Sequence, residues 1–339
     1  MQEIKRFDIH DKWNWLVHYV RYRKNQFYEK VTGKSHWAMP KMVAGHILLS
    51  TKRTNKEIYD AIIAGKPYWA GRWGGTEMNM IYEFMKHGFH SEYDNREEAT
   101  NRLCSLSGFF PNDIELGQRF VDSMLSVCGQ IDLQGQWRRY MEDYIYLRYQ
   151  RNTKLSQLFH IEPWNMYKYK NSSQKPWSAA LKGKKVLVVH PFVESIEKQY
   201  AENREHLFEK IFDSADILPE FELKTLKAVQ TLAGEEDNRF ENWFDALEWM
   251  ENKMDQIDYD VAIIGCGAYG YPLAAHAKEM GKVAIHLGGA TQILFGIIGS
   301  RWEVENPKFC NDVVNEYWVR PMDSEKIKNG KKVENGCYW

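Results

Sequence analysis

The pattern of apolar and polar positions predicts alternating strands and helices across the second half of the chain. Short apolar runs with β-branched residues, a pattern typical of buried strands, occur at 184–190, 221–229, 260–264 and 283–287. Amphipathic stretches typical of helices occur at 195–212, 242–254, 274–280 and 292–298. Strands that are apolar along their whole length are typical of parallel sheets covered on both faces. We therefore expect an α/β fold of the Rossmann-like, doubly wound kind, with a mostly parallel sheet and helices on both faces.

The first half of the chain is mainly helical in pattern. Helices are expected at 12–31, 54–64, 77–87, 95–107 and 113–128, and a short strand at 68–70. A capping box from Thr54 to Glu57 is expected to open the second of these helices, and Gly65 to end it. Ser195 is a candidate cap for the later helix at 195–212.

Composition suggests how the chain is divided. We expect an N-terminal helical extension over 1–50, a main α/β domain over 51–305, and a solvated C-terminal tail over 306–339. The segment 130–180 is aromatic, basic and irregular, and we interpret it as an insert. Its aromatic residues resemble a sugar-stacking surface or ordinary packing between layers.

Glycines follow two of the expected strands. Gly265, Gly267 and Gly270 come directly after the strand at 260–264, and Gly288 and Gly289 after the strand at 283–287. Ligands of parallel sheets lie at the carboxyl ends of strands, and glycine lets a phosphate approach the backbone. These glycines predict a nucleotide or sugar-nucleotide site. Glycines at such turns also serve tight packing alone, and that alternative stays open.

A third junction carries charge. The strand at 68–70 leads into Gly71-Arg-Trp-Gly-Gly-Thr76, with Arg72 before the glycine pair Gly74 and Gly75, and Glu77 in the first turn of the next helix. Arg72 could hold a phosphate or pair with Glu77. The carboxylate of Glu77 could bind a metal, act as a base, or complement the helix dipole, and its position favours the last of these roles.

The net charge excludes one class of partner. Lys and Arg number 45 and Asp and Glu 46, so no overall field favours nucleic acid. The five cysteines form no C-x-x-C pair, which argues against a disulfide scaffold and a structural zinc site. No apolar run approaches the length of a membrane span, and we expect a cytoplasmic protein. The aromatic and basic helix at 12–31 could contact a membrane surface peripherally, but we expect it to pack on its own domain.

The run from Gly265 to Gly270 also fits the fingerprint of dinucleotide-binding proteins. An NAD enzyme needs an acidic residue at the end of the next strand to hold the ribose hydroxyls. That strand ends in His286-Leu-Gly-Gly289, without Asp or Glu. The sequence therefore argues against an NAD(P)-dependent oxidoreductase.

A series of short motifs resembles those of the GT-D-type glycosyltransferases, long catalogued as a domain of unknown function. The motifs are RWGGTE at 72–77, KKVLVVHPF at 184–192, LPEFEL at 218–223, WFDAL at 243–247, GAYG at 267–270, HLGG at 286–289, and then FG at 295–296 and RW at 301–302. The resemblance covers roughly residues 55–303. It implies a Rossmann-like sheet and transfer of a sugar from a nucleotide diphosphate sugar, in bacterial glycan or glycoprotein assembly.

The first motif departs from the family in one position. The family's R-x-G-D-G-E ties an Asp-x-Glu pair to metal and diphosphate. Arg72, Gly74 and Glu77 match, but Gly75 stands where the aspartate is expected. A Mn²⁺ or Mg²⁺ ion would then rest on Glu77, waters and substrate phosphates, or the enzyme would work without metal, with Arg72 stabilising the departing diphosphate.

The sequence thus predicts a glycosyltransferase that uses a nucleotide diphosphate sugar, a UDP-sugar by expectation, and a glycan or glycoprotein acceptor. The diphosphate is expected between the Arg72–Glu77 turn and the strand ends at His190, Gly267 and Gly288. His190 and His286 could orient a hydroxyl or bind phosphate, or only cap their strands. Tyr269 could stack on the base or the sugar. A non-catalytic glycan- or nucleotide-binding protein on the same fold is the second hypothesis.

Overall fold

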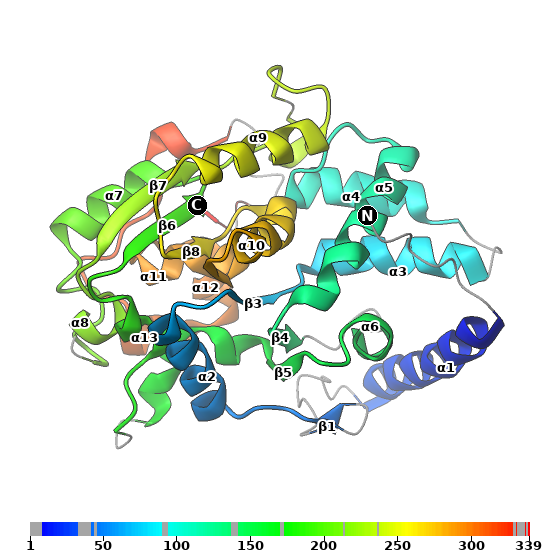
Figure 1. Cartoon of the computed structure of the whole chain (residues 1–339), viewed down its shortest axis with the longest axis horizontal. Coiled ribbons are helices and arrows are strands. Elements are labelled where there is room, and N and C mark those ends of the chain that lie inside the picture. Colours follow the sequence, from blue (N-terminus) through cyan, green and yellow to red (C-terminus); the bar gives the residue numbers. More distant parts are fainter. Residues whose placement is uncertain are drawn as a thin grey trace.

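The chain folds around one seven-stranded, wholly parallel sheet with the strand order β5-β4-β3-β9-β8-β6-β7 (Figure 1). The computed structural model describes residues 9–32, 42–43, 46–89, 94–136, 142–169, 173–212, 214–235, 237–327, 330, 336 and 338–339. The strands are β3 Tyr68–Arg72, β4 Leu133–Gln136, β5 Lys154–Gln157, β6 Lys185–His190, β7 Glu222–Lys227, β8 Val261–Ile264 and β9 Val283–His286. A separate hairpin pairs β1 Met42–Val43 with β2 His46–Ile47. The predicted doubly wound α/β fold is confirmed.

Successive residues of the central strands belong to two different cores, one on each face of the sheet. Ala262 and Ala284 pack into one core, while their neighbours Ile263 and Ile285 pack into the other. The first core receives α3 Gly75–Phe89, α4 Arg96–Ser107, α5 Ile114–Val127, α9 Trp243–Asp255 and α10 Gly270–Glu279. The second receives α2 Thr51–Ala64, α7 Val193–Glu202, α8 Ser214–Ile217, α11 Thr291–Leu294 and α13 Pro307–Val313. The strands are apolar along their length because both faces are covered.

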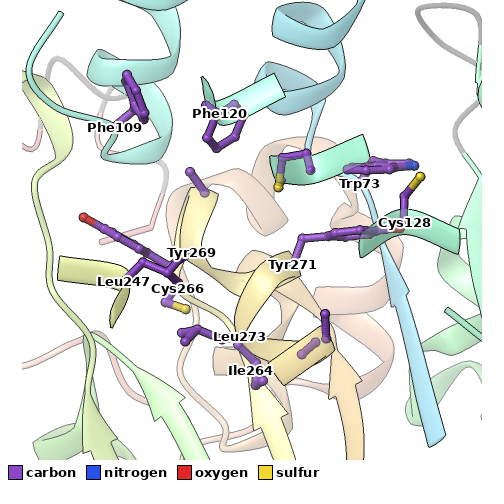
Figure 2. Close-up of a cluster of buried hydrophobic side chains, with 14 of the residues drawn as sticks. Trp73, Phe109, Phe120, Cys128, Leu247, Ile264, Cys266, Tyr269, Tyr271 and Leu273 are labelled. Atoms are coloured by element: carbon purple, nitrogen blue, oxygen red, sulfur yellow. The ribbon is translucent and has the colours of Figure 1, made fainter. Parts of the chain in front are cut away.

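Large aromatic side chains fill the first core (Figure 2). Trp73 stacks on Tyr271 with ring centroids 3.8 Å apart, and Tyr269 stacks on Trp243 at 5.0 Å. Phe120 meets Trp243 edge-on at 5.1 Å. Stacked and edge-on pairs of this kind add to the free energy of burying the rings. Part of the high aromatic content of the chain thus packs the start of α10 against α5 and α9.

The segment expected to be irregular, 130–180, supplies two strands of the sheet. β4 and β5 lie in it, with α6 Glu142–Tyr149 between them, so this expectation is wrong. The strands escaped notice because they are short and polar. Gln134 of β4 is buried and accepts a hydrogen bond from the Tyr271 hydroxyl at 3.1 Å, which satisfies an amide that would otherwise be costly to bury. Residues 137–141 of this segment lie outside the described part.

Two expected helix starts are also wrong. Ser50, rather than Thr54, caps α2, because its hydroxyl accepts a bond from the Arg53 amide at 3.4 Å. Ser195 lies inside the first turn of α7 and does not cap it. Gly65 ends α2 in the left-handed conformation at φ 61°, as expected.

The N-terminal helix α1, Ile9–Thr32, packs on the first core through its Trp15 side only, because Leu16, Val20, Phe27 and Val31 are 43–68% exposed, so the expected packing on its own domain is confirmed only in part. Trp15 is buried there, and the Nδ1 of His18 lies 3.1 Å from a carboxylate oxygen of Asp143 in α6. Among the described helices, none is both long enough and apolar enough to cross a membrane.

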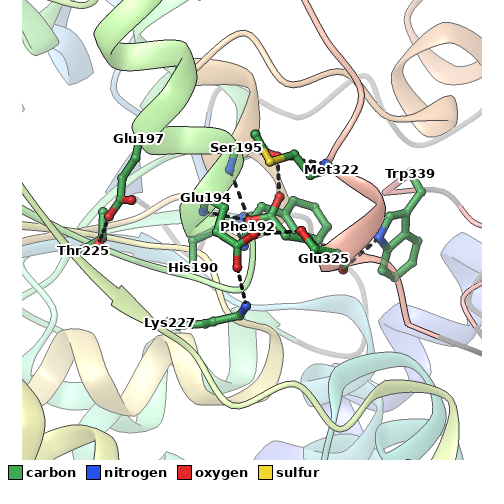
Figure 3. A network of polar contacts seen from close by, with 11 residues as sticks. His190, Phe192, Glu194, Ser195, Glu197, Thr225, Lys227, Met322, Glu325 and Trp339 are labelled. Atoms are coloured by element: carbon green, nitrogen blue, oxygen red, sulfur yellow. Dashed lines mark hydrogen bonds and ion pairs between the residues drawn. The ribbon is translucent and has the colours of Figure 1, made fainter.

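The C-terminal segment docks on the domain, so the expectation of a solvated tail is wrong for its described residues. The Val319 carbonyl accepts a bond from the Ile298 amide at 2.8 Å. Glu325 is buried at the start of α7, where its carboxylate accepts bonds from the amides of Glu194 and Ser195 at 2.8 and 3.2 Å and from the Ser195 hydroxyl (Figure 3). α12 Ser300–Glu305 and α13 lead into this segment. Where the domains begin and end stays a prediction.

We expect Glu325→Ala to lower the free energy of unfolding by about 1–3 kcal/mol, because it leaves the amide donors at the start of α7 buried without an acceptor. Asp323→Ala in the same turn is the control. The Asp323 side chain is 95% exposed and forms a surface pair with Lys326, so its removal should cost under about 0.5 kcal/mol. Urea unfolding of both variants checks this, and equal losses would contradict the capping role.

Candidate functional site

The central strands β3, β9, β8 and β6 end at one edge of the sheet. Because all four are parallel, Arg72, His286, Gly265 and His190 gather at this edge. The helix that follows β3, α3, packs on the first core, whereas α11, which follows β9, packs on the second. The chain thus leaves these two neighbouring strands on opposite faces of the sheet, and ligands of such sheets commonly bind between two strands of that kind.

The end of β6 is filled by the protein itself. His190 is 2% exposed, and its Nδ1 accepts a bond from the Phe192 amide at 3.0 Å. Burial lowers the pKa of His190 to about 3, so its ring is neutral at physiological pH. Glu325 occupies the amides of α7 just beyond it, and the Trp339 ring lies 5.8 Å from that of Phe192. His190 therefore caps its strand, which is the structural alternative that the sequence left open.

The glycines after β8 serve close packing. A Cβ added at Gly267, where φ is +58°, would lie 2.5 Å from the Ser107 carbonyl oxygen. At Gly265 it would lie 2.5 Å from the Gly288 carbonyl oxygen, and at Gly270 it would collide with the Nε2 of His286. The resemblance to a dinucleotide fingerprint therefore has a packing explanation at all three positions.

Tyr269 lies in the aromatic core rather than at an open surface. Its side chain is 1% exposed, and one face of its ring stacks on Trp243. Burial raises the pKa of its hydroxyl. The structure therefore argues against the expected role of Tyr269 in stacking on a base or sugar.

Glu77 lies at the first turn of α3, folded over Gly74. It is 5% exposed, its carboxylate accepts a bond from the Thr76 hydroxyl at 2.9 Å, and a Cβ at Gly74 would collide with it. Burial raises the pKa of Glu77, against the bonds from Thr76 and Ser107 and the charge of Arg72. The arrangement fits complementation of the helix dipole.

These residues do not by themselves make a site for Mn²⁺ or Mg²⁺. Among the described residues, no group of three or more His, Cys, Asp or Glu side chains is placed to hold a metal ion. A Cβ at Gly75 would meet nothing within 4 Å, so the position expected to hold an aspartate has open space for a Cβ but carries no carboxylate. An ion at Glu77 would need waters and substrate phosphates for most of its ligands.

The ends of β3 and β9 bring Arg72 against the second glycine pair. A Cβ at Gly288, where φ is +59°, would lie 3.1 Å from the Nη2 and 3.2 Å from the Nε of Arg72. Only glycine lets this backbone lie so close to the guanidinium in that conformation. Burial lowers the pKa of Arg72, and the carboxylates of Glu162 and Glu77 raise it. The guanidinium of Arg72 therefore keeps its positive charge because two carboxylates lie near it.

His286 lies beneath this turn. The His286 side chain is 4% exposed, and a Cβ added at Gly71 would lie 3.0 Å from the Cβ of His286. Burial, and next the charge of Arg72, lower its pKa to about 3. His286 is therefore a neutral ring packed between β3 and α10, close to Arg72, and Gly289 follows directly above it in the turn.

Three residues that the sequence did not single out for the site join it: Glu162, Arg301 and Tyr338. Each acts electrostatically on Arg72. Glu162 follows the unexpected strand β5, and the Asn165 amide donates a bond to its Oε2 at 2.9 Å. Tyr338 lies in the segment expected to be solvated, and Arg301 was noted only within a family motif. No local pattern in the sequence could have identified Glu162 or Tyr338, because both reach the site through elements that the pattern did not predict.

The carboxyl of Glu162 suits proton transfer near neutral pH. Burial raises its pKa to about 7, against the charge of Arg72 and the bond from Asn165. A group whose pKa lies near the operating pH exchanges protons most effectively with a reacting hydroxyl. The edge between β3 and β9 thus combines buried or half-buried cations, which suit a diphosphate, with a carboxyl that can accept a proton.

Comparison with known proteins gives one match. Residues 238–294 match the family model of the GT-D fold-like domain, a stretch that contains α9, β8, α10, β9 and the Gly288–Gly289 turn. No curated protein and no solved structure matched. The match confirms the resemblance to the GT-D-type family and indicates a glycosyltransferase-related fold. Arg72, Glu162 and Arg301 lie outside the matched stretch.

We expect Gly265→Ala to lower the free energy of unfolding by about 1–3 kcal/mol, because the added methyl has no room between the ends of β8 and β9. Gly75→Ala is the control, since nothing lies within 4 Å of the added Cβ. It should change stability by less than about 0.5 kcal/mol or stabilise the first turn of α3. Urea unfolding checks both, and equal effects would contradict the packing role of Gly265.

The raised pKa of Glu162 predicts a pH-dependent stability. Its pKa rises from an ordinary 4.5 to about 7, so the folded protein binds one more proton than the unfolded chain between these values. The contribution of Glu162 to stability should therefore fall as pH rises through this window. Relative to wild type, Glu162→Gln should gain stability from pH 4.5 to 7 and change little above pH 8. Urea unfolding at several pH values measures this, and parallel curves would contradict it.

Proposed function

We propose that this protein is a glycosyltransferase that transfers a sugar from a nucleotide diphosphate sugar to a glycan or glycoprotein acceptor, with a UDP-sugar as the expected donor. The observation that carries the proposal is the close approach of the Arg72 guanidinium to Gly288, where the chain leaves β3 and β9 on opposite faces of the sheet. A planar guanidinium beside a glycine backbone suits the phosphate groups of a nucleotide. The GT-D-like match over residues 238–294 supports the same class of chemistry.

In the proposed reaction an acceptor hydroxyl attacks the anomeric carbon of the donor sugar. The bond from that carbon to the diphosphate oxygen breaks, and the electron pair leaves with the diphosphate. Arg72 stabilises the negative charge that develops on the leaving group. Glu162 accepts the proton that the acceptor hydroxyl loses.

A metal ion stays a proposal within this scheme. If Mn²⁺ or Mg²⁺ takes part, Glu77 is the carboxylate that would hold it, and the ion would help to neutralise the diphosphate. Because Glu77 already accepts a bond from Thr76, we assign the metal no step.

The second candidate is a non-catalytic glycan- or nucleotide-binding protein on the same fold. It is favoured by one observation, the glycine at position 75 in place of a carboxylate, in a spot where a side chain would fit. An NAD(P)-dependent oxidoreductase has less support. The strand β9 ends in His286 without an acid for the ribose, and its fingerprint glycines are packed against protein atoms.

The first experiment is thermal unfolding with UDP, GDP, CMP and NAD, each with Mn²⁺ and with EDTA. A ligand at about 100 times its Kd stabilises the native state by about 2.7 kcal/mol, which raises Tm by several degrees. We expect UDP or GDP to raise Tm. Arg72→Lys should reduce that shift because it keeps the charge but loses the planar fork, whereas Arg239→Lys, in a surface pair with Asp237, should not.

The outcomes separate the candidates. A shift with UDP or GDP, together with release of free nucleotide from the matching sugar donor, supports the transferase. A shift that disappears in EDTA and in Glu77→Ala assigns the metal to Glu77. Binding without release supports the non-catalytic protein, and the absence of any shift up to millimolar nucleotide would sink the donor site.

A further inference from the structure

The turn Gly288–Gly289 is covered on its second residue by the C-terminal segment. A Cβ at Gly289 would lie 2.6 Å from the Cε1 of Tyr338, so the ring of Tyr338 rests directly on this backbone. The Gln292 amide donates a bond to the Tyr338 carbonyl at 3.3 Å, which anchors the same residue to α11. Of two consecutive glycines, one therefore faces Arg72 and the other faces Tyr338.

Tyr338 also contacts a second arginine. The Nη1 of Arg301 donates a hydrogen bond to the Tyr338 hydroxyl at 3.2 Å, and its guanidinium carbon lies 4.8 Å from the ring centroid. Arg301 belongs to α12 and is half-buried, with its Nε 3.9 Å from Glu305. The positive charge of Arg301 repels that of Arg72 and so lowers the pKa of Arg72. The Tyr338 hydroxyl has the opposite effect and raises the pKa of Arg72. The two guanidinium groups and the phenol oxygen thus form one electrostatic cluster.

Two cations that line one turn, Arg72 at Gly288 and Arg301 through Tyr338 at Gly289, are stabilised by an anion or a polar acceptor between them. Glu162 and Glu77 supply part of that balance for Arg72. The Tyr338 oxygen is a neutral acceptor at the Arg301 side of the cluster, and a phosphate oxygen would make a stronger, charge-assisted bond with the same N–H group. A phosphate that approached the Gly289 backbone would meet the Tyr338 ring first.

We infer that Arg72 and Arg301 form one binding site for the diphosphate of a nucleotide ligand, and that the Tyr338 hydroxyl holds the position of a phosphate oxygen until the ligand displaces it. The inference rests on the proposed function for the identity of the ligand, but not for the anion site. It adds Arg301 as the second phosphate-binding side chain and makes the C-terminal segment a competitor for that site.

Calorimetric titration with pyrophosphate and, separately, with UDP tests this. Tyr338→Phe keeps the ring and removes the oxygen to which Arg301 donates, so pyrophosphate should bind about threefold to tenfold more tightly. Tyr338→Ala also uncovers Gly289 and should bind at least as tightly as Tyr338→Phe. Arg301→Gln should weaken binding by about tenfold or more, both in the wild type and in the Tyr338→Ala background.

The control is Tyr317→Ala, in the same C-terminal segment, whose ring stacks on His206 at 4.5 Å. It should bind pyrophosphate as the wild type does. Unfolding curves of all variants exclude affinity changes that come from misfolding. Unchanged or weaker pyrophosphate binding in both Tyr338 variants would overturn the inference. Unchanged binding would mean that the phenol has no effect on the site, and weaker binding would mean that it helps to bind the ligand.

The two ligands distinguish this inference from the proposed function. Pyrophosphate binding that responds to Tyr338 and Arg301, without binding of UDP or GDP, upholds the anion site and rejects the nucleotide donor. UDP binding that ignores both residues upholds the proposed function and rejects the inference. If neither ligand binds any variant, both are rejected.

Discussion

A half-buried positive charge at the centre of the sheet edge is the constraint on which this site depends. The guanidinium of Arg72 follows the inner strand β3, and burial disfavours its charged form. An ion in such a place is tolerated only where other polar groups compensate it. Here Glu162 arrives from the β5 side and Glu77 from the first turn of α3. The short helix η2, Leu158–Ile161, leads directly to Glu162 and so brings this carboxylate to the site. The glycine turn after β9 leaves space for the guanidinium itself.

The other strand ends illustrate how a parallel sheet satisfies its own edge. The amides at the start of α7 bond to Glu325, and the Gly267 turn lies against the end of α4 at Ser107. Each of these places resembles a phosphate site in sequence, because a glycine or a helix start follows a strand. Each is filled by a group from a distant part of the chain. The turn after β9 differs at its first glycine, Gly288, because an arginine rather than an acceptor faces it.

The sequence predicts the fold well where burial leaves a periodic pattern. The strands β6, β8 and β9 and the helices α3, α4, α5 and α9 lie close to their expected ranges, because their apolar residues face one or both cores. β4 and β5 were missed because Gln134, Gln136 and Gln157 interrupt the apolar pattern, and their burial depends on partners that are distant in sequence. For the site, the sequence placed Arg72, His286 and Gly288 at one edge. It could not place Glu162 or Tyr338, whose approach to Arg72 is a tertiary property.

The open space at Gly75 bears on what the fold itself requires at that position. No atom lies within 4 Å of a Cβ built at that position, and its backbone is not in the left-handed region that favours glycine. The glycine is therefore required neither by its backbone conformation nor by the space around its Cα. A side chain could begin at this position without moving a neighbouring group, so the residue here escapes the packing constraints that require glycine at positions 265, 267 and 270.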